Sequence, residues 1–212
     1  MKQVLEMHLH THHSKDSLMQ IPKIIHIAKE RGLTGLAITD HNTFQGVHEA
    51  QKYNKDPSFF IIPGMEIKTE FGDVIGLFLI SEIKSRKYTK VVQEIHAQKG
   101  LVVFPHPFSK NSSFKKTLLN DIDLIEVFNS RNKSIWNEKA TEIALQEKIP
   151  AIVGSDAHNY FEVGRSRTIV YGASLEKIKK NLLVSTHFTK KYTNYYLSHG
   201  LSFLTEKTKA LI

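Results

Sequence analysis

Hydrophobic residues follow two spacings along this chain. Short runs rich in Val, Ile, Leu and Phe have the length of buried strands, and between them apolar side chains recur every three or four positions, as on amphipathic helices. The predicted strands are residues 4–10, 35–39, 59–66, 74–80, 101–104, 124–128, 151–154 and 168–171. The predicted helices are residues 21–31, 43–53, 88–99, 134–148 and one that begins at residue 174 or 175.

Strands that alternate with helices indicate an α/β protein with a parallel sheet. Seven or eight strands within 212 residues favour a compact barrel over an open sheet. The sequence shows no internal repeat, low-complexity stretch or Gly/Ser/Pro linker. We therefore expect a single domain over residues 1–212, with residues 172–212 as a basic helical extension packed on the barrel.

The composition restricts the kinds of metal site that the chain can form. With 41% hydrophobic and 24% charged residues, the chain is typical of a folded globular protein. It contains no cysteine, so disulfides and thiolate metal sites are excluded, and any metal must bind to His, Asp, Glu or Asn. No apolar run approaches the roughly 20 residues that cross a bilayer, and the first seven residues are too short for a signal peptide. We expect a cytoplasmic location and no membrane partner.

Potential metal ligands follow the predicted strands. Five short segments carry them: His8-Leu9-His10, Thr39-Asp40-His41, Gly64-Met65-Glu66, Pro105-His106-Pro107 and Ser155-Asp156-Ala157-His158. Asp16 lies in the loop after the first segment. Imidazoles mixed with carboxylates suit Zn²⁺, Mn²⁺ or Fe²⁺ better than Ca²⁺. A barrel can gather such groups at one mouth, so the pattern predicts a metal-dependent hydrolase.

No single segment carries this prediction. His8 and His10 share a face if the strand continues through them, but one His-x-His pair is weak evidence. Each segment could also be a hydrogen-bonded histidine at a strand end or an aspartate that caps a helix. That explanation would have to apply five times at the same topological position, which favours metal binding.

The motifs resemble those of the polymerase-and-histidinol-phosphatase (PHP) family. The resemblance covers about residues 4–171, in the family's order. It is carried by five segments: His8-Leu9-His10-Thr11-His12-His13-Ser14-Lys15-Asp16-Ser17, Ala37-Ile38-Thr39-Asp40-His41-Asn42, Pro63-Gly64-Met65-Glu66-Ile67, Val103-Phe104-Pro105-His106-Pro107 and Val153-Gly154-Ser155-Asp156-Ala157-His158.

The resemblance implies a distorted (β/α)7 barrel, similar to a TIM barrel, with two or three divalent metal ions. It assigns three ligand sets, in which Glu66 bridges the first two: His8, His10, Glu66 and Asp156; Glu66 and His106; and Asp16, His41 and His158. Many members place a further His or Cys after the strand that here covers residues 124–128. This chain has Asn129 there, a weaker ligand, so occupancy of the second site stays open.

The expected reaction is hydrolysis of a phosphate ester of a small metabolite or nucleotide, with a metal-bridging hydroxide as the attacking group. His12, His13 and Asp40 are candidates for groups that support the metal ligands and move protons. Arg165 and Arg131 are candidates for binding the substrate phosphate.

Two alternatives remain at this stage. The net charge is +8, and residues 172–212 contain seven lysines against two glutamates, which would suit a nuclease that acts on short nucleic acid ends. A PHP-like barrel can also be a non-catalytic accessory subunit. The sequence does not specify the substrate, the metal, the role of the basic tail or the oligomeric state.

Overall fold

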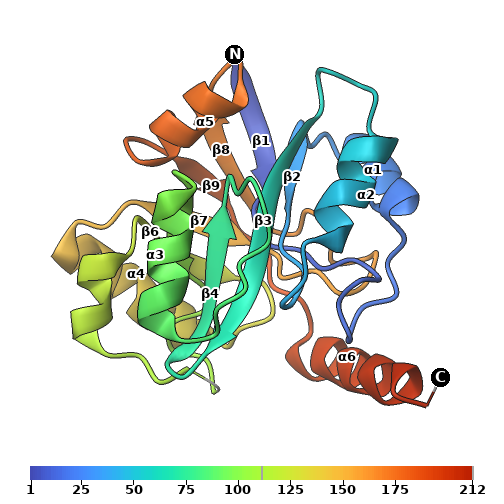
Figure 1. Cartoon of the computed structure of the whole chain (residues 1–212). Helices are drawn as coiled ribbons and strands as arrows, with labels where there is room; N and C mark the ends of the chain where they lie inside the picture. Colours follow the sequence, from blue (N-terminus) through green and yellow to red (C-terminus); the bar gives the residue numbers. More distant parts are fainter. Residues whose placement is uncertain (111, 212) are drawn as a thin grey trace.

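The computed structural model describes residues 1–110 and 112–211. Its strands form one sheet with the order β7-β6-β5-β4-β3-β2-β1-β8-β9 (Figure 1). The strands are β1 (Lys2–Glu6), β2 (Gly35–Ile38), β3 (Phe60–Thr69), β4 (Gly72–Leu77), β5 (Leu101–Phe104), β6 (Leu124–Asn129), β7 (Ala151–Gly154), β8 (Arg167–Tyr171) and β9 (His187–Thr189). The helices are α1 (Ile21–Glu30), α2 (Gln45–Tyr53), α3 (Tyr88–Ala97), the 3-10 helix η1 (Lys116–Asp121), α4 (Ser134–Glu147), α5 (Leu175–Leu182) and α6 (Tyr195–Lys209).

The sheet curves into a nearly closed barrel. Strands β1 to β7 lie side by side in chain order, and the segments after the first and the last of them meet. Leu9 and Ala157 form a parallel bridge, and the backbone N–H of His10 donates to the carbonyl of Ala157 at 2.9 Å. This confirms the predicted TIM-like, distorted (β/α)7 barrel.

The prediction of a parallel sheet is only partly correct. The pairs β1–β2, β2–β3, β5–β6 and β6–β7 are parallel, whereas β4 is antiparallel to both neighbours and β8 is antiparallel to β1 and β9. Only residues 70–71 separate β3 from β4. A parallel pair needs a crossover of about a dozen residues, so this short connection forces a hairpin.

Helices cover the outside of the barrel. In Figure 1, α1 and α2 lie on the side of β1 and β2, and α3 and α4 lie on the opposite side. Helix α1 shows why the predicted period works: Ile21, Ile24, Ile25 and Ala28 are buried on one face. The helix ends before Gly32, whose φ of 74° is a left-handed conformation that glycine adopts without a steric penalty.

The first predicted strand is shorter than expected. Its regular pairing ends at Glu6, and only the isolated bridge at Leu9 continues it, so the prediction of a strand through residue 10 is wrong at its end. The backbone N–H groups of His8 and Leu9 donate instead to the side chains of Glu6 and Thr39, at 3.1 and 3.0 Å. Side-chain acceptors thus replace the sheet where the predicted metal ligands begin.

The C-terminal extension includes the strand β9 as well as helices, which corrects the expectation that it is wholly helical; Ile212 lies outside the described residues. Helix α6 crosses the end of the barrel opposite the N-terminus (Figure 1). Lys209 Nζ donates to the carbonyls of His12, Ser14 and Ser17 at 2.6–2.8 Å. A side-chain amine held by three carbonyls ties this helix to the loop after β1.

Within the described residues, we find no helix that combines the length and the hydrophobicity needed to cross a membrane.

Candidate metal centre

All eight predicted metal ligands lie at the α6 end of the barrel. They come from the segments after β1, β2, β5 and β7, from β3 and from the loop before α1: His8, His10, Asp16, His41, Glu66, His106, Asp156 and His158. In a barrel the carboxyl ends of parallel strands share one rim, which is why residues distant in sequence meet there.

Glu66 is at the middle of this group and is only 1% exposed. Its Oε2 lies 3.4 Å from His8 Nε2, 3.3 Å from His10 Nε2 and 3.0 Å from His41 Nδ1. Its Oε1 lies 3.0 Å from His106 Nε2. One carboxylate therefore contacts four imidazoles through both of its oxygens, the arrangement needed to bridge two ions.

Asp156 contacts the same two N-terminal histidines. Its Oδ1 lies 3.5 Å from His8 Nε2 and 3.2 Å from His10 Nε2. The backbone of Asp156 has a φ of 54°, and that of His106 has a φ of 29°. Positive φ is uncommon for residues other than glycine and is found where the surrounding structure holds a side chain in a required direction.

A third group involves Asp16 on the loop before α1. Its Oδ2 lies 3.4 Å from His41 Nε2 and 3.1 Å from His158 Nε2. Asp16 thus contacts both His41 and His158, the residues that the family resemblance assigned with it to a third ion.

The residues present fit divalent ions. An ion that holds donors tetrahedrally at 2.0–2.2 Å separates them by roughly 3.3–3.6 Å, close to the distances above. His8 Nε2, His10 Nε2, Asp16 Oδ1 and Glu66 Oε2 are buried and have no hydrogen-bond partner among the described residues. Buried polar atoms without partners cost free energy. His8 Nε2 and His10 Nε2 both face Glu66 Oε2, so these three atoms fit a bound cation.

Protonation states also suit metal binding. Burial, together with the neighbouring His158 and His41, lowers the pKa of His10 to about 3, so its imidazole is neutral and can bind an ion. Burial opposes ionisation of Glu66, but His41 and His8 hold the pKa of this carboxyl well below its usual range. His10 thus offers a neutral nitrogen beside an ionised Glu66. Burial opposes protonation of His8 and His41, but the neighbouring carboxylates raise the pKa of both, so these imidazoles would give up a proton on binding an ion.

Glu126 supports the site and was not predicted. Its Oε1 accepts from His8 Nδ1 at 3.0 Å, and its Oε2 accepts from the backbone N–H of His106 at 2.9 Å. The signal was present in the sequence, because Glu126 stands alone among the apolar residues of β6, where a charged residue is rarely buried without a partner. Gly154 makes room for this pair: a Cβ there would lie 2.4 Å from Glu126 Oε1 and 2.5 Å from His8 Cβ.

Asp40 acts through a neighbouring hydroxyl. Its Oδ1 accepts from Ser14 Oγ at 2.7 Å, and that Oγ lies 3.2 Å from His10 Nδ1. Thr11 donates to Asp40 through both its backbone N–H and its hydroxyl. Asp40 thus holds the loop after β1 and orients His10, and it does not line the cavity at the metal centre.

The structure does not bring His12 and His13 to this cavity. His13 Nε2 lies 2.8 Å from Glu49 Oε2, and His12 Nε2 lies 3.5 Å from the same atom. Glu49 is on α2, so both histidines face that helix.

Asn129 contacts the site through Asp156, and Arg131 lines its cavity, but other groups of the protein occupy their polar atoms. The Asn129 amide donates to Asp156 at 3.3 Å, and its oxygen accepts from the backbone N–H of Arg131 at 2.9 Å. Arg131 Nη1 contacts His158 Nδ1, and Nη2 donates to Ser202 Oγ at 2.8 Å. Arg131 therefore links His158 to α6.

Arg165 lies elsewhere. It lines a separate cavity with Arg31, Arg167, Lys190 and Lys191, and its Nε donates to the carbonyl of Phe161 at 3.3 Å.

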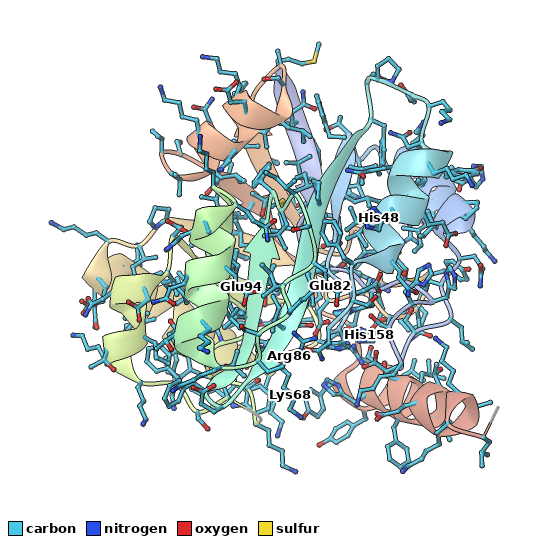
Figure 2. All side chains as sticks on the ribbon, in the orientation of Figure 1. His48, Lys68, Glu82, Arg86, Glu94 and His158 are labelled. Carbon is cyan, nitrogen blue, oxygen red and sulfur yellow. The ribbon has the colours of Figure 1, made fainter. Side chains whose placement is uncertain are left out.

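The metal-centre cavity has a volume of about 490 Å³. Helix α6 forms one wall with Tyr195, His199, Ser202, Phe203 and Glu206, and Trp136 comes from α4. His158, labelled in Figure 2, lies between the barrel and this helix. The sequence did not predict that the aromatic tail lines the site, because the docking of α6 depends on tertiary contacts.

The fold and the site define a TIM-like barrel with a cluster of histidines and carboxylates suited to metal binding at one rim. The chain matches the PHP domain over residues 6–212 and belongs to this family, as the motifs suggested.

One protein of similar sequence and two solved structures of similar fold are consistent with this family. Uncharacterized protein MJ1587 of Methanocaldococcus jannaschii is 34% identical over 156 residues, which cover 67% of this chain and 91% of that protein. The structure also resembles a two-domain protein of Bacteroides vulgatus that contains a predicted PHP-like metal-dependent phosphoesterase. The TM-score is 0.77 at 17% sequence identity, and the match covers 97% of this chain and 70% of that protein. The lesion-specific endonuclease PfuEndoQ of Pyrococcus furiosus has a TM-score of 0.67 at 19% sequence identity, and the match covers 96% of this chain and 66% of that protein.

Proposed function

We propose that this protein is a metal-dependent phosphoesterase, a hydrolase that cleaves a phosphate ester of a small metabolite or nucleotide. The observation that carries the proposal is the convergence of five imidazoles and three carboxylates, with donor atoms 3.0–3.5 Å apart. PHP family membership and the likeness to a phosphoesterase fold support it.

We assign the ligands to two or three ions of Zn, Mn or Fe. The sets are those that share short distances: His8, His10, Glu66 and Asp156; Glu66 and His106; and Asp16, His41 and His158. Such ions, when bound, activate water and neutralise charge on a phosphoryl group. The second set has the fewest protein donors, because the Asn129 amide oxygen already accepts from the backbone of Arg131.

The size and lining of the metal-centre cavity suit a small anionic substrate. A cavity of about 490 Å³ fits within the range of small-molecule sites, roughly 300–1,000 Å³. Trp136, Tyr195 and Phe203 offer aromatic surface to a base or another apolar group. Lys110 adds a positive charge at the rim that would attract an anionic substrate. A bound phosphate would lie toward the metal ligands, with its organic group toward α6.

Hydrolysis of p-nitrophenyl phosphate and of a panel of phosphomonoesters by Mn²⁺- or Zn²⁺-loaded protein tests the proposal. We expect activity that a chelator removes, and a fall in kcat of more than about 100-fold in Glu66→Gln. Glu82→Gln, an exposed residue that carries the same chemical change, is the control. A loaded protein that hydrolyses no phosphate ester would contradict the proposal, and a preparation that binds no metal would favour the accessory subunit.

A nuclease is the second candidate. The likeness to the fold of PfuEndoQ supports it, as does the surplus of positive charge. The wall formed by α6 favours the small substrate, because a strand of nucleic acid would have to pass beside the helix. Short single-stranded oligonucleotides in the same panel separate the two.

A further inference from the structure

A second cavity, of about 550 Å³, is lined by five positively charged side chains. They come from the end of α1, the loop between β7 and β8, the start of β8 and the residues after β9: Arg31, Arg165, Arg167, Lys190 and Lys191. None of its lining residues lines the metal-centre cavity, and none is an aspartate or a glutamate.

None of these five cations forms an ion pair with an acidic side chain among the described residues; Glu30 attracts Arg31 only from a greater distance. Within the described residues, the lysines and arginines that do form ion pairs are Lys15, Lys29, Lys116 and Arg131. Burial, and then repulsion from Arg165 and Arg167, lowers the pKa of Arg31. Like charges without a counter-ion raise the free energy of the folded protein, and a bound anion would relieve that cost.

Backbone carbonyls hold the three guanidinium groups in place. Arg31 Nη1 donates to the carbonyls of Phe161 and Val163. Arg165 donates to Phe161 and Tyr192, and Arg167 Nε donates to Gly164 at 2.8 Å. In each case Nη2 has no acceptor among the described residues. Neutral acceptors fix the side chains without cancelling their charge, which leaves oriented donors for an anion.

We propose that this cavity binds a ligand with at least two phosphate groups, at a site separate from the metal centre. Guanidinium groups match phosphate oxygens with paired, directional hydrogen bonds. One phosphate carries at most about two negative charges and would leave most of the five positive charges unpaired. Neighbouring phosphates occur both in a nucleotide polyphosphate and in a nucleic acid strand.

The cavity and the metal centre share the loop between β7 and β8. Glu162 lies between two residues of the cavity wall, Phe161 and Val163. Its Oε2 accepts from the backbone N–H of His158 at 2.9 Å, and its Oε1 lies 3.6 Å from Arg131 Nε. A ligand in the cavity would thus rest against the loop that carries His158.

Binding by the metal-loaded protein tests the proposal with two probes. One is ADP, measured by calorimetry; the other is a fluorescent single-stranded hexanucleotide with hydrolysis-resistant phosphorothioate linkages, measured by anisotropy. The variant is Arg167→Gln/Lys190→Gln. The control, Lys177→Gln/Lys180→Gln, removes the same charge from the exposed face of α5. Lys190→Gln/Lys191→Gln, on the exposed segment after β9, serves if the first variant does not fold.

We expect the cavity variant to lose at least tenfold in affinity for one or both probes, while the control stays within twofold of wild type. A loss for ADP alone identifies a nucleotide polyphosphate. A loss for the oligonucleotide identifies a strand, and its salt dependence should become shallower by about 1.4, because each single-strand phosphate contact contributes about 0.7. Equal losses in both variant pairs, or no binding of either probe at about 0.1 M salt, would overturn the proposal.

Discussion

Glu126 Oε1 lies 3.0 Å from Nδ1 of His8, and neither side chain is exposed to solvent. The carboxylate can only accept, so the hydrogen bond places a proton on Nδ1 and leaves Nε2 as the nitrogen that would bind an ion. Nε2 faces Glu66 and Asp156 at 3.4 and 3.5 Å. A histidine that binds a metal usually has such a partner on its other nitrogen, which fixes its tautomer and ring orientation.

We predict that Glu126→Gln weakens metal binding. The carboxylate accepts from His8 Nδ1, from the backbone N–H of His106 and from the Asn129 amide. An amide NH₂ would oppose at least one of these donors. Loss of a supporting carboxylate typically costs about 10–100-fold in metal affinity, which competition with a chromogenic chelator measures.

Glu138→Gln is the control for this substitution, because Glu138 is exposed on α4. If both variants kept the affinity of the wild type, the role assigned to Glu126 would be wrong.

We predict that Gly154→Ala destabilises the protein by about 3 kcal/mol, at the upper end of the range for an overpacked core. The new Cβ would lie 2.4 Å from Glu126 Oε1 and 2.5 Å from His8 Cβ, so both side chains would have to move. Chemical denaturation measures the free energy of unfolding, and metal analysis should show reduced occupancy.

Gly200→Ala offers a matched comparison. A Cβ at this position on α6 has no neighbour within 4 Å, so we expect a gain of about 0.5–1 kcal/mol from helix propensity. Equal effects at both glycines would show that crowding beside His8 does not matter.

We predict that the metal-free protein loses stability as the pH rises toward 9. Burial alone would lower the pKa of His106, but the hydrogen bond and charge of Glu66 raise it to about 9. The usual value is about 6.5, so the stabilisation is complete below pH 6.5 and is lost as the pH passes 9. Its upper limit is about 3 kcal/mol.

Thermal unfolding of chelator-treated protein between pH 6 and pH 9.5 measures this loss. His106→Asn should flatten the profile in that window, and an unchanged profile would refute the assignment.

We predict that Lys209→Met loosens α6. Its amine donates to three carbonyls of the loop after β1, so its loss should cost about 2 kcal/mol and widen the cavity. Hydrolysis of bulky phosphate esters should rise relative to p-nitrophenyl phosphate. Lys207→Met, which changes an exposed residue two positions away, should alter neither value; identical substrate preferences in the two variants would mean that α6 does not limit access.

The sequence predicted the barrel and the eight residues that meet at its rim, because both depend on local patterns: apolar runs of strand length and polar residues just after them. It did not predict the direction of β4 and β8, since a run of hydrophobic residues reads the same in either direction. The sequence also suggested that Arg165 binds substrate phosphate at the metal centre. In the structure it lines a separate cavity, because the loop that carries it turns toward the end of α1.

Other parts of the site depend on contacts between distant residues. Glu126 stands out in the sequence as a charge within an apolar strand, but its partners come from other segments and only the structure shows them. Helix α6 has a mixed surface, and its docking relies on Lys209 and on Arg131. His12 and His13 stand next to the first motif in the sequence, yet the turn of the loop points them to Glu49 on α2.

The bridge between Leu9 and Ala157 has a consequence for biosynthesis. A ribosome that has made the first half of the chain has already released His8 and His10, but their partner Asp156 does not yet exist. Under the proposed ligand assignment, the emerging protein would hold an ion only weakly until the segment after β7 has left the exit tunnel, so metal loading would come late in translation.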